Sequence, residues 1–141
     1  MTNSGDARRG RVELFSPEGL NQNPAFSNVA VVSGPVRTIY VGGQDAVTAD
    51  GEIVGKGDMA AQIRQVFENI KTALAAAGAT MADIVKRQTF TTDIDAYFEN
   101  IEARMEHGGD NLSTSTTVEV RRLSHPDFLI EVEVMAVLPQ P

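Results

Sequence analysis

Apolar residues recur along this chain at two different periods, and each change of period marks a predicted element. The clearest helical pattern begins behind Asp58, a good N-cap, and ends before Gly78, a residue type that often terminates helices. The apolar residues at helical spacing between these two positions are Ile63, Val66, Phe67, Ile70, Leu74 and Ala77. The pattern predicts one long amphipathic helix with its apolar side against a core.

A shorter helix is predicted behind Asp93 or Asp95, either of which suits an N-cap. Its apolar residues share one face at helical spacing, and they are Tyr97, Phe98, Ile101 and Met105. The segment HGGDN, residues 107–111, ends this helix because glycine and asparagine favour turns.

Strand patterns surround the two helices. Alternating and β-branched residues predict strands over 84–92, 113–122 and 129–137. Residues 29–32 and 37–43 flank the turn signal SGPV and therefore predict a hairpin. The order is roughly ββαβαββ, and two amphipathic helices cover only one face of such a sheet.

The last predicted strand has two unlike faces. Ile130, Val132, Val134 and Ala136 point one way, which we expect to be the helix side. The other face mixes apolar and acidic residues, and it consists of Leu129, Glu131, Glu133, Met135 and Val137. A large apolar patch is rarely left exposed, so we expect other subunits to cover this face.

Length and composition fit one globular domain of 141 residues, with residues 1–10 as a polar, mobile tail and residues 11–141 as the folded unit. The absence of cysteine excludes disulfides and thiol nucleophiles. The N-terminus lacks the apolar stretch of a signal peptide, and no apolar run approaches the ~20 residues that span a bilayer. We expect a cytoplasmic protein without a membrane partner.

Charge argues against a nucleic-acid partner. The formal net charge is −7, which repels phosphate backbones unless cations cluster. The cations form only small groups, at Arg8/Arg9/Arg11, Lys86/Arg87 and Arg121/Arg122. We therefore expect no specific binding of RNA or DNA.

Several residue groups are candidates for chemistry, each with a plainer alternative. His107 and His125 fall in predicted loops without a third ligand at metal spacing, so no metal site is expected. The glycines of VGG permit close approach either of a ligand or of a neighbouring strand. Glu131 and Glu133 form either a solvated edge or a pocket where one acid activates a water. The hydroxyl run STSTT is either an edge strand or a polar ligand surface.

The chain resembles the Rid family, which includes the YjgF/RidA imine deaminases and relatives labelled endoribonuclease L-PSP. The resemblance covers roughly residues 24–138, and the segments that carry it are NPAFSNVAVVSG, IYVGGQ, AAQIRQVFENIKTALAAAGATMADIVKRQTFTTDI, TTVEVRRL and IEVEVMAV. It implies a chorismate-mutase-like α+β fold with a mixed sheet. It also implies a homotrimer with a central β-barrel and ligand clefts between subunits. Members hydrolyse enamines and imines without a cofactor.

The resemblance also implies site residues, some of them changed. Ser115 stands where the family has its substrate-orienting arginine, and Phe26 stands where it has a tyrosine. Gly43 keeps the turn glycine, and Glu131 matches the glutamate associated with the reactive water. Thr117 matches a position that contacts ligand through its backbone.

The family asparagine of the second helix corresponds to Asn100, across a one-residue gap. Arg121 shares the strand face of Ser115 but lies about 20 Å away along the strand, so within one subunit it does not replace the missing clamp. A cation from a neighbouring chain stays open. The replacement of the family arginine and tyrosine predicts a cleft that binds neutral or differently charged ligands.

The leading hypothesis is a trimer that binds a small polar metabolite and hydrolyses an imine or enamine other than small 2-imino acids. The alternatives are a non-catalytic metabolite-binding or regulatory trimer and, third, an endoribonuclease. Ammonia release from imines discriminates the first two hypotheses, and RNA cleavage tests the third.

Overall fold

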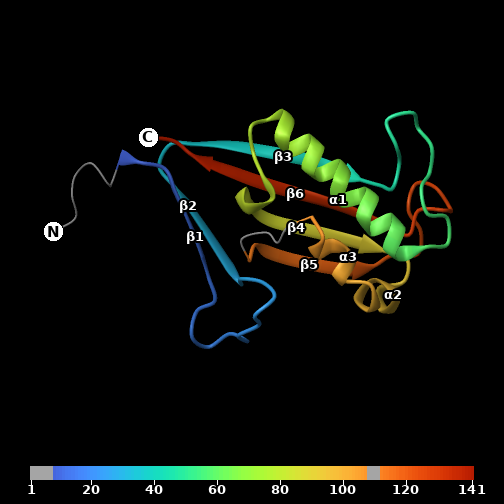
Figure 1. The fold of residues 1–141 in the computed structure, drawn as a ribbon. Helices are drawn as coiled ribbons and strands as arrows, with labels where there is room; N and C mark the ends of the chain where they lie inside the picture. The colour runs from blue at the N-terminus through green and yellow to red at the C-terminus, as the bar shows by residue number, and fades with distance from the viewer. Residues whose placement is uncertain (1–7, 108–111) are drawn as a thin grey trace.

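A computed structural model describes residues 8–107 and 112–141 as a four-stranded sheet with helices on one face and a two-stranded ribbon at one end (Figure 1). The first seven residues of the expected tail, and residues 108–111 of the HGGDN segment, lie outside the described residues. The elements are β1 (Arg11–Phe15), β2 (Val29–Ser33), β3 (Val36–Gln44), α1 (Met59–Ala76), the short 3-10 helix η2 (Met81–Asp83), β4 (Ile84–Thr91), α2 (Ile94–Glu99), α3 (Glu102–Met105), β5 (Thr114–Glu119) and β6 (Ile130–Pro139).

The large sheet is mixed, as expected for an α+β fold. Its strand order is β3-β6-β4-β5, so β3 and β5 are the edges. β6 runs antiparallel to both of its neighbours, whereas β4 and β5 run parallel. A parallel pair needs a crossover connection, and α2 and α3 supply it between these two strands.

The long helix α1 forms where the sequence predicts it. Asp58 caps its start, because the side-chain oxygen accepts a hydrogen bond from the Ala61 amide at 3.1 Å. Its end is marked by Gly78, whose φ of +81° favours glycine. The apolar side of α1 is fully buried and packs over the sheet, with Ile63, Val66, Phe67, Ile70 and Leu74 in the core.

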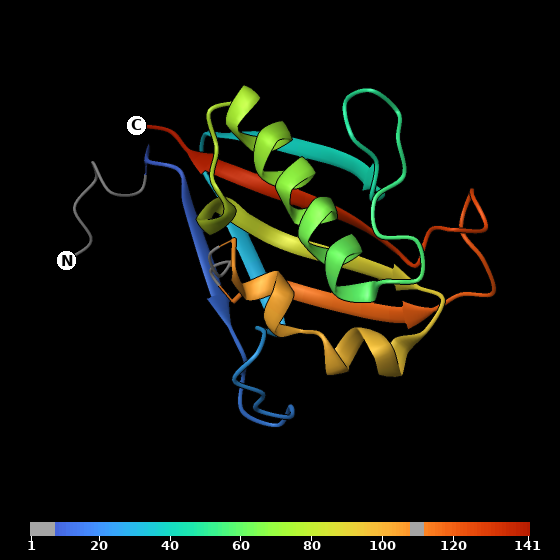
Figure 2. The same ribbon diagram turned by 45° about the vertical axis from the view of Figure 1, so that its right-hand side comes forward.

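The hairpin predicted over residues 29–43 is wrong. β2 pairs with β1, and β3 pairs with β6, so the turn at Ser33 and Gly34 joins two separate sheets. A turn signal shows where the chain bends but does not choose the partner of the next strand. The β1–β2 ribbon lies at one end of the large sheet, near the C-terminus (Figures 1 and 2).

The second predicted helix is present but broken. Asp93 caps α2, with its side chain accepting from the Ala96 amide at 3.0 Å, and the chain re-enters a helix as α3. The shared face is only partly correct. Tyr97 is buried, whereas Phe98, the next residue of α2, and Met105, which lies after the break at Asn100, are each 55% exposed.

The two faces of β6 agree with the sequence pattern along most of its length. Ile130, Val132, Val134 and Ala136 are buried on the helix side. Val137 departs from the expectation that another subunit covers the opposite face, because it is only 2% exposed within a single chain. It lines a cavity together with Val12 of β1, so the chain's own ribbon contributes to this end of the face.

Within residues 8–107 and 112–141, no helix is both long and apolar enough to cross a membrane.

Candidate functional site

A pocket of about 380 Å³ lies between β5, the helices α2 and α3 and the loop before β2. We call it the arginine pocket, and Figure 2 shows α2 and α3 lying along the β5 edge of the sheet. Its lining combines two cations, three aromatic rings and two hydroxyls, and the residues concerned are Arg87, Arg104, Phe26, Tyr97, Phe98, Ser115 and Thr117.

Arg87 is the principal cation of this pocket. It lies on β4 as the register partner of Ser115 on β5, and its Nη2 approaches the Ser115 Oγ at 3.4 Å. Only 4% of Arg87 is exposed. Sequence reasoning considered only Arg121 for this place within one chain, and Arg87 is a second arginine of the same chain that it did not consider. The guanidinium comes from the adjacent strand and fills the place beside a small serine.

The loop that carries Phe26 is fixed to the start of β5. The Ser27 amide donates to the carbonyl oxygens of Leu112 and Ser113, at 3.1 and 3.2 Å. The Asn23 side chain accepts from the Ala25 amide at 2.8 Å and tightens the turn before it. These bonds hold the Phe26 ring against Arg87 and Ser115, which all line a second cavity of about 330 Å³ as well.

Of the residues proposed for the site from the sequence, Phe26, Ser115 and Thr117 meet in the arginine pocket. Asn100 does not line it. As the C-cap of α2, Asn100 directs its side-chain nitrogen to the Ala96 carbonyl at 2.8 Å, which serves the end of the helix.

Gly43 and Glu131 meet elsewhere, where β3 bulges between Val41 and Gln44. A Cβ atom added to Gly43 would lie 2.8 Å from the Glu131 carboxyl carbon, a distance that real side chains do not tolerate. The neighbouring Gly42 has open space at the same position. Within the chain, the Glu131 carboxyl thus lies over the Gly43 backbone, and a larger residue at this position would require the Glu131 side chain to shift.

A second acid, Asp45, completes this carboxyl pair. Its side chain is hydrogen-bonded to Glu131. Burial, that hydrogen bond and the Glu131 charge together raise the pKa of Asp45 to about 7. Two carboxyls in contact cannot both ionise readily, so the pair shares a proton near neutral pH.

The arginine pocket and the carboxyl pair lie on opposite faces of the sheet. Ser115 is in register with Arg87, and Glu131 is in register with Phe90. Arg87 and Phe90 are three residues apart on one strand, and side chains at odd separations point to opposite faces. The two groups therefore cannot meet within one chain.

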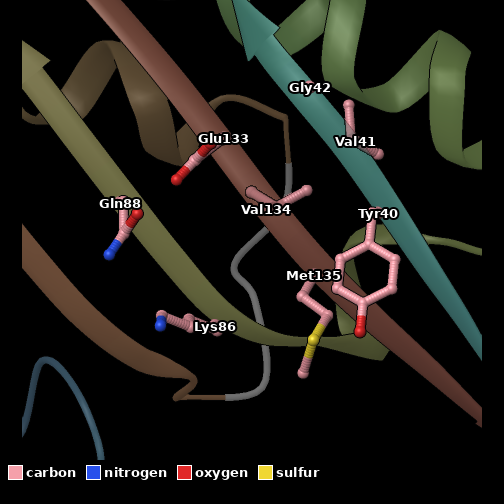
Figure 3. A pocket seen from close by; sticks show the side chains of 8 residues that line it. All are labelled: Tyr40, Val41, Gly42, Lys86, Gln88, Glu133, Val134 and Met135. Carbon is pink, nitrogen blue, oxygen red and sulfur yellow. The ribbon is translucent and has the colours of Figure 1, made fainter.

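The face that carries Glu131 also has an open pocket of about 260 Å³ near the middle of the sheet. Figure 3 shows the side chains that line it, which come from β3, β4 and β6 and include Tyr40, Lys86, Gln88, Glu133 and Met135. Tyr40 is 79% exposed, which is unusual for an aromatic residue in the middle of a strand.

The described residues give no support to a metal site, because no three of their histidine and acidic side chains are grouped to hold an ion. His107 Nδ1 lies 3.3 Å from a Glu68 oxygen, and His125 Nδ1 accepts the Asp127 amide at 3.0 Å. Neither histidine lines the arginine pocket.

Sequence reasoning missed three of the functional candidates. Arg87 and Ser115 are 28 positions apart, so only the parallel pairing of β4 and β5 brings them together. An arginine among β-branched residues on the inner side of a strand was the available signal. Arg104 and Asp45 had no such signal, since Arg104 lies in the short helix α3 and Asp45 directly follows the end of β3.

Comparison with known proteins gives one consistent result. The family model described as Endoribonuclease L-PSP matches residues 20–138. A RutC family protein of Pyrococcus abyssi is 39% identical over 99 residues, which cover 70% of this chain and 76% of the relative. A crystal structure of the Rid family protein YyfB from Yersinia pestis aligns with a TM-score of 0.78 and 31% identity, covering 90% and 98% of the two chains.

Escherichia coli TdcF, solved with bound serine, is similar over 72% of this chain and 80% of its own, with a TM-score of 0.64 and 32% identity. The family match spans most of the chain, and the relatives share both its sequence and its fold. The chain therefore belongs to the YjgF/Rid family, whose matching family model carries the description Endoribonuclease L-PSP.

Proposed function

We propose that this protein assembles as a homotrimer, binds a small metabolite with an anionic group in clefts between chains, and hydrolyses an imine or enamine there. The observation that carries the proposal is the buried Arg87 guanidinium beside Ser115, in a pocket with space for a ligand. An arginine binds a carboxylate through two parallel, charge-assisted hydrogen bonds. The sequence predicted a neutral or differently charged ligand because the family arginine is replaced at position 115, and Arg87 beside that position favours an anionic ligand.

The placement of the arginine pocket and the carboxyl pair supports the proposal of a shared cleft. The arginine pocket opens at the β5 edge, and the carboxyl pair lies on the opposite face, near the other edge of the sheet. A second copy that packs its open face toward β5 would bring its carboxyl pair to the first copy's arginine pocket. Trimeric packing of the open faces as a central barrel satisfies this requirement and covers Tyr40.

The chemistry needs few groups. Water adds to the imine carbon, a proton moves to the nitrogen, and the adduct releases ammonia and leaves a carbonyl product. Arg87 orients the substrate through its anionic group, and Glu131 positions the attacking water. Glu131 accepts the proton that the attacking water loses, and Asp45 shares that proton with Glu131. Serine bound to the relative TdcF supports an amino-acid-like ligand.

An assay of imine decay tests the proposal. The imine is generated in situ from an amino acid, and its disappearance and the release of ammonia are followed against a buffer blank. We expect the wild type to accelerate decay and Arg87→Gln to lose at least about 10-fold, because charged hydrogen bonds contribute about 1.5–3 kcal/mol. Arg121→Gln removes an exposed arginine of the same strand region and serves as the matched control. A wild type no faster than the blank, or an unaffected Arg87→Gln, would refute this assignment.

One observation favours a second candidate, which is ligand binding without turnover. The Glu131 carboxyl is already engaged by Asp45, and a carboxyl held in this way is less available to a water. Ligand binding without ammonia release would select this candidate. Ribonuclease activity has weaker support, because the net charge is −7 and neither histidine lines the pocket. RNA cleavage that persists through repurification would reinstate it.

A further inference from the structure

The side-chain amide of Asn69 links the helix α1 to the residue that carries the second acid of the carboxyl pair. Its Nδ2 donates to the backbone carbonyl of Asp45 at 3.1 Å and to that of Val47 at 2.9 Å. Both carbonyls belong to the loop that leads from β3 to α1 (Figure 1). The Asn69 Oδ1 accepts from the side-chain nitrogen of Gln65, one turn earlier on the helix, at 2.8 Å. This last bond fixes which end of the amide is the donor, so both amide hydrogens face the loop.

The loop between β3 and α1 closes on itself and is attached to the helix at both of its ends. Ala46 is fully buried, and its carbonyl accepts from the Val54 amide at 2.9 Å. Near the start of α1, the Gln62 side chain donates to the Gly55 carbonyl at 3.3 Å. Asn69 makes the corresponding attachment at the end that follows β3. It therefore fixes the backbone of the first residue after that strand, which is the acid.

Asp45 connects the helix side of the sheet with the opposite face. Its carbonyl is bound by Asn69, whereas its carboxyl is hydrogen-bonded to Glu131. Ile130 and Val132, the neighbours of this glutamate on β6, are buried on the helix side, so the glutamate points the other way. The Asp45 Oδ1 is buried without a hydrogen-bond partner among the described residues. A buried acceptor without a donor costs free energy, so the backbone must hold this carboxyl in place.

We propose that Asn69 is a positioning residue for the carboxyl pair: its amide holds the Asp45 backbone so that the Asp45 carboxyl stays against Glu131, and Asn69 acts on the reaction only through that pair. This inference rests on the proposed function, because it assigns a further residue to the same site. Both amide hydrogens of Asn69 are engaged with the loop, so its role requires no contact with the substrate. Without that amide, the Asp45 carboxyl turns toward solvent and Glu131 loses the partner that shares its proton.

The titration of Asp45 tests the inference without any turnover. Carbon-13 NMR of labelled aspartate carboxyls follows the upper titration step of the pair, and Asp45→Asn identifies its signal by removing it. The wild type should titrate near the pKa of about 7 that burial, the hydrogen bond to Glu131 and the Glu131 charge produce. In Asn69→Leu the Asp45 carboxyl leaves Glu131, so its pKa should fall by at least about one unit.

Three further variants of α1 are the controls for this shift. Gln65→Leu removes only the bond that orients the Asn69 amide, and it should lower the pKa of Asp45 by a smaller amount. Thr72→Ala removes a hydrogen bond that the helix makes to its own backbone and should leave this pKa unchanged. Ile63→Val lowers stability from within the core and should also leave it unchanged, which separates a loss of stability from a loss of position.

The kinetics of imine hydrolysis give the second measurement. Asn69→Leu should lower kcat at least about 10-fold and leave KM within about threefold of the wild type, because the substrate is bound by the arginine pocket on the other face of the sheet. The pH midpoint of kcat should move together with the pKa of Asp45. Thermal melting of each variant shows that it is folded.

The outcomes separate this inference from the proposed function. An unchanged Asp45 pKa in a folded Asn69→Leu overturns the inference, and so does an equal shift in Ile63→Val. If Asn69→Leu does not fold, an unchanged pKa in Gln65→Leu overturns it. A lowered pKa with an unchanged kcat also overturns it, because Asn69 would then not serve the reaction. A lowered pKa in a protein whose wild type hydrolyses no imine supports the positioning of Asp45 and overturns only the catalytic proposal.

Discussion

At the scale of single residues, Arg87 places a guanidinium beside position 115, where the family resemblance leads one to expect an arginine and this chain has a serine. Neighbouring strands lie about 4.8 Å apart, so a long side chain on β4 can cover the place above a short one on β5. The 3.4 Å contact between Arg87 Nη2 and Ser115 Oγ shows that it does so. A serine at this position is therefore compatible with a cationic pocket, and it leaves the space that the guanidinium occupies.

The position of Arg87 beside Ser115 predicts what happens when an arginine is placed at position 115 instead. Ser115→Arg alone should lower the free energy of unfolding by about 1–3 kcal/mol and should not improve activity, because it forces a second guanidinium against Arg87 in a desolvated site. Combining it with Arg87→Thr should recover stability and imine hydrolysis together. Chemical denaturation and the imine assay on the two single variants and the double variant form the required cycle. A single Ser115→Arg that is stable and more active would show that Arg87 does not fill this place.

Asp45 gives the protein a predictable dependence on pH. Its pKa rises from 3.8 in the unfolded chain to about 7 in the folded one, so the folded state keeps a proton that the unfolded state loses between these values. The contribution of this proton to the free energy of unfolding is fully present below pH 3.8 and disappears as the pH rises through 7. Stability should fall across this window by at most about 1.4 kcal/mol per pH unit, and by less because Asp45 stays partly exposed.

The variant Asp45→Asn isolates this effect, since an amide can still donate to Glu131 but does not titrate. Relative to the wild type, it should gain stability between pH 5 and pH 8. Urea denaturation at both values measures the difference. If the free energies of unfolding of Asp45→Asn and the wild type differ by the same amount at pH 5 and at pH 8, Asp45 does not take up the proton.

At the scale of elements, the bulge of β3 is what allows Glu131 to lie against its neighbour. Gly43→Ala places a methyl group 2.8 Å from the Glu131 carboxyl carbon and should displace the carboxyl, with a loss of imine hydrolysis of at least about 10-fold. Gly42→Ala, in the same strand, meets nothing within 4 Å and is the matched control. Steady-state kinetics of the two variants make the comparison. Equal kinetics would place Glu131 outside the reaction.

The elements also show which parts of the fold the sequence can reveal. α1 is predictable because Asp58, the apolar stripe and Gly78 all act within one helix and its ends. The partner of β3 is not, because β6 lies almost a hundred residues along the chain and no local pattern encodes that choice. The same limit hides Arg87, whose role depends on the pairing of β4 with β5.

Resemblance to the family identifies candidate site residues, which hydrophobic periodicity cannot identify, but it does so only position by position. It indicates Phe26, Ser115 and Thr117, which the structure gathers in one pocket, and Gly43 and Glu131, which it gathers in another place. It does not reveal a substitute on another strand. Only the sheet register brings Arg87 beside Ser115 and makes it a candidate substitute.

At the scale of the whole molecule, a single chain leaves one face of its sheet incompletely covered. Tyr40 is 79% exposed and Val118 is 39% exposed, and Met135 lies in register with Tyr40 on the same open face. The arginine pocket and the carboxyl pair lie on opposite faces of the sheet, so the proposed shared cleft requires a second copy. The proposed self-association covers this exposed apolar surface and brings the arginine pocket and the carboxyl pair together.

We therefore expect light scattering on a sizing column to give three times the 15.2 kDa chain mass at micromolar concentration. Tyr40→Asp and Met135→Asp should each lower this mass and abolish imine hydrolysis, because a charge on a buried interface is strongly unfavourable. Leu20→Asp adds the same charge at an exposed apolar residue of the loop after β1 and should change neither property. A monomeric wild type would defeat both the trimer and the shared cleft. Active monomers of Tyr40→Asp would show instead that one chain contains the whole site.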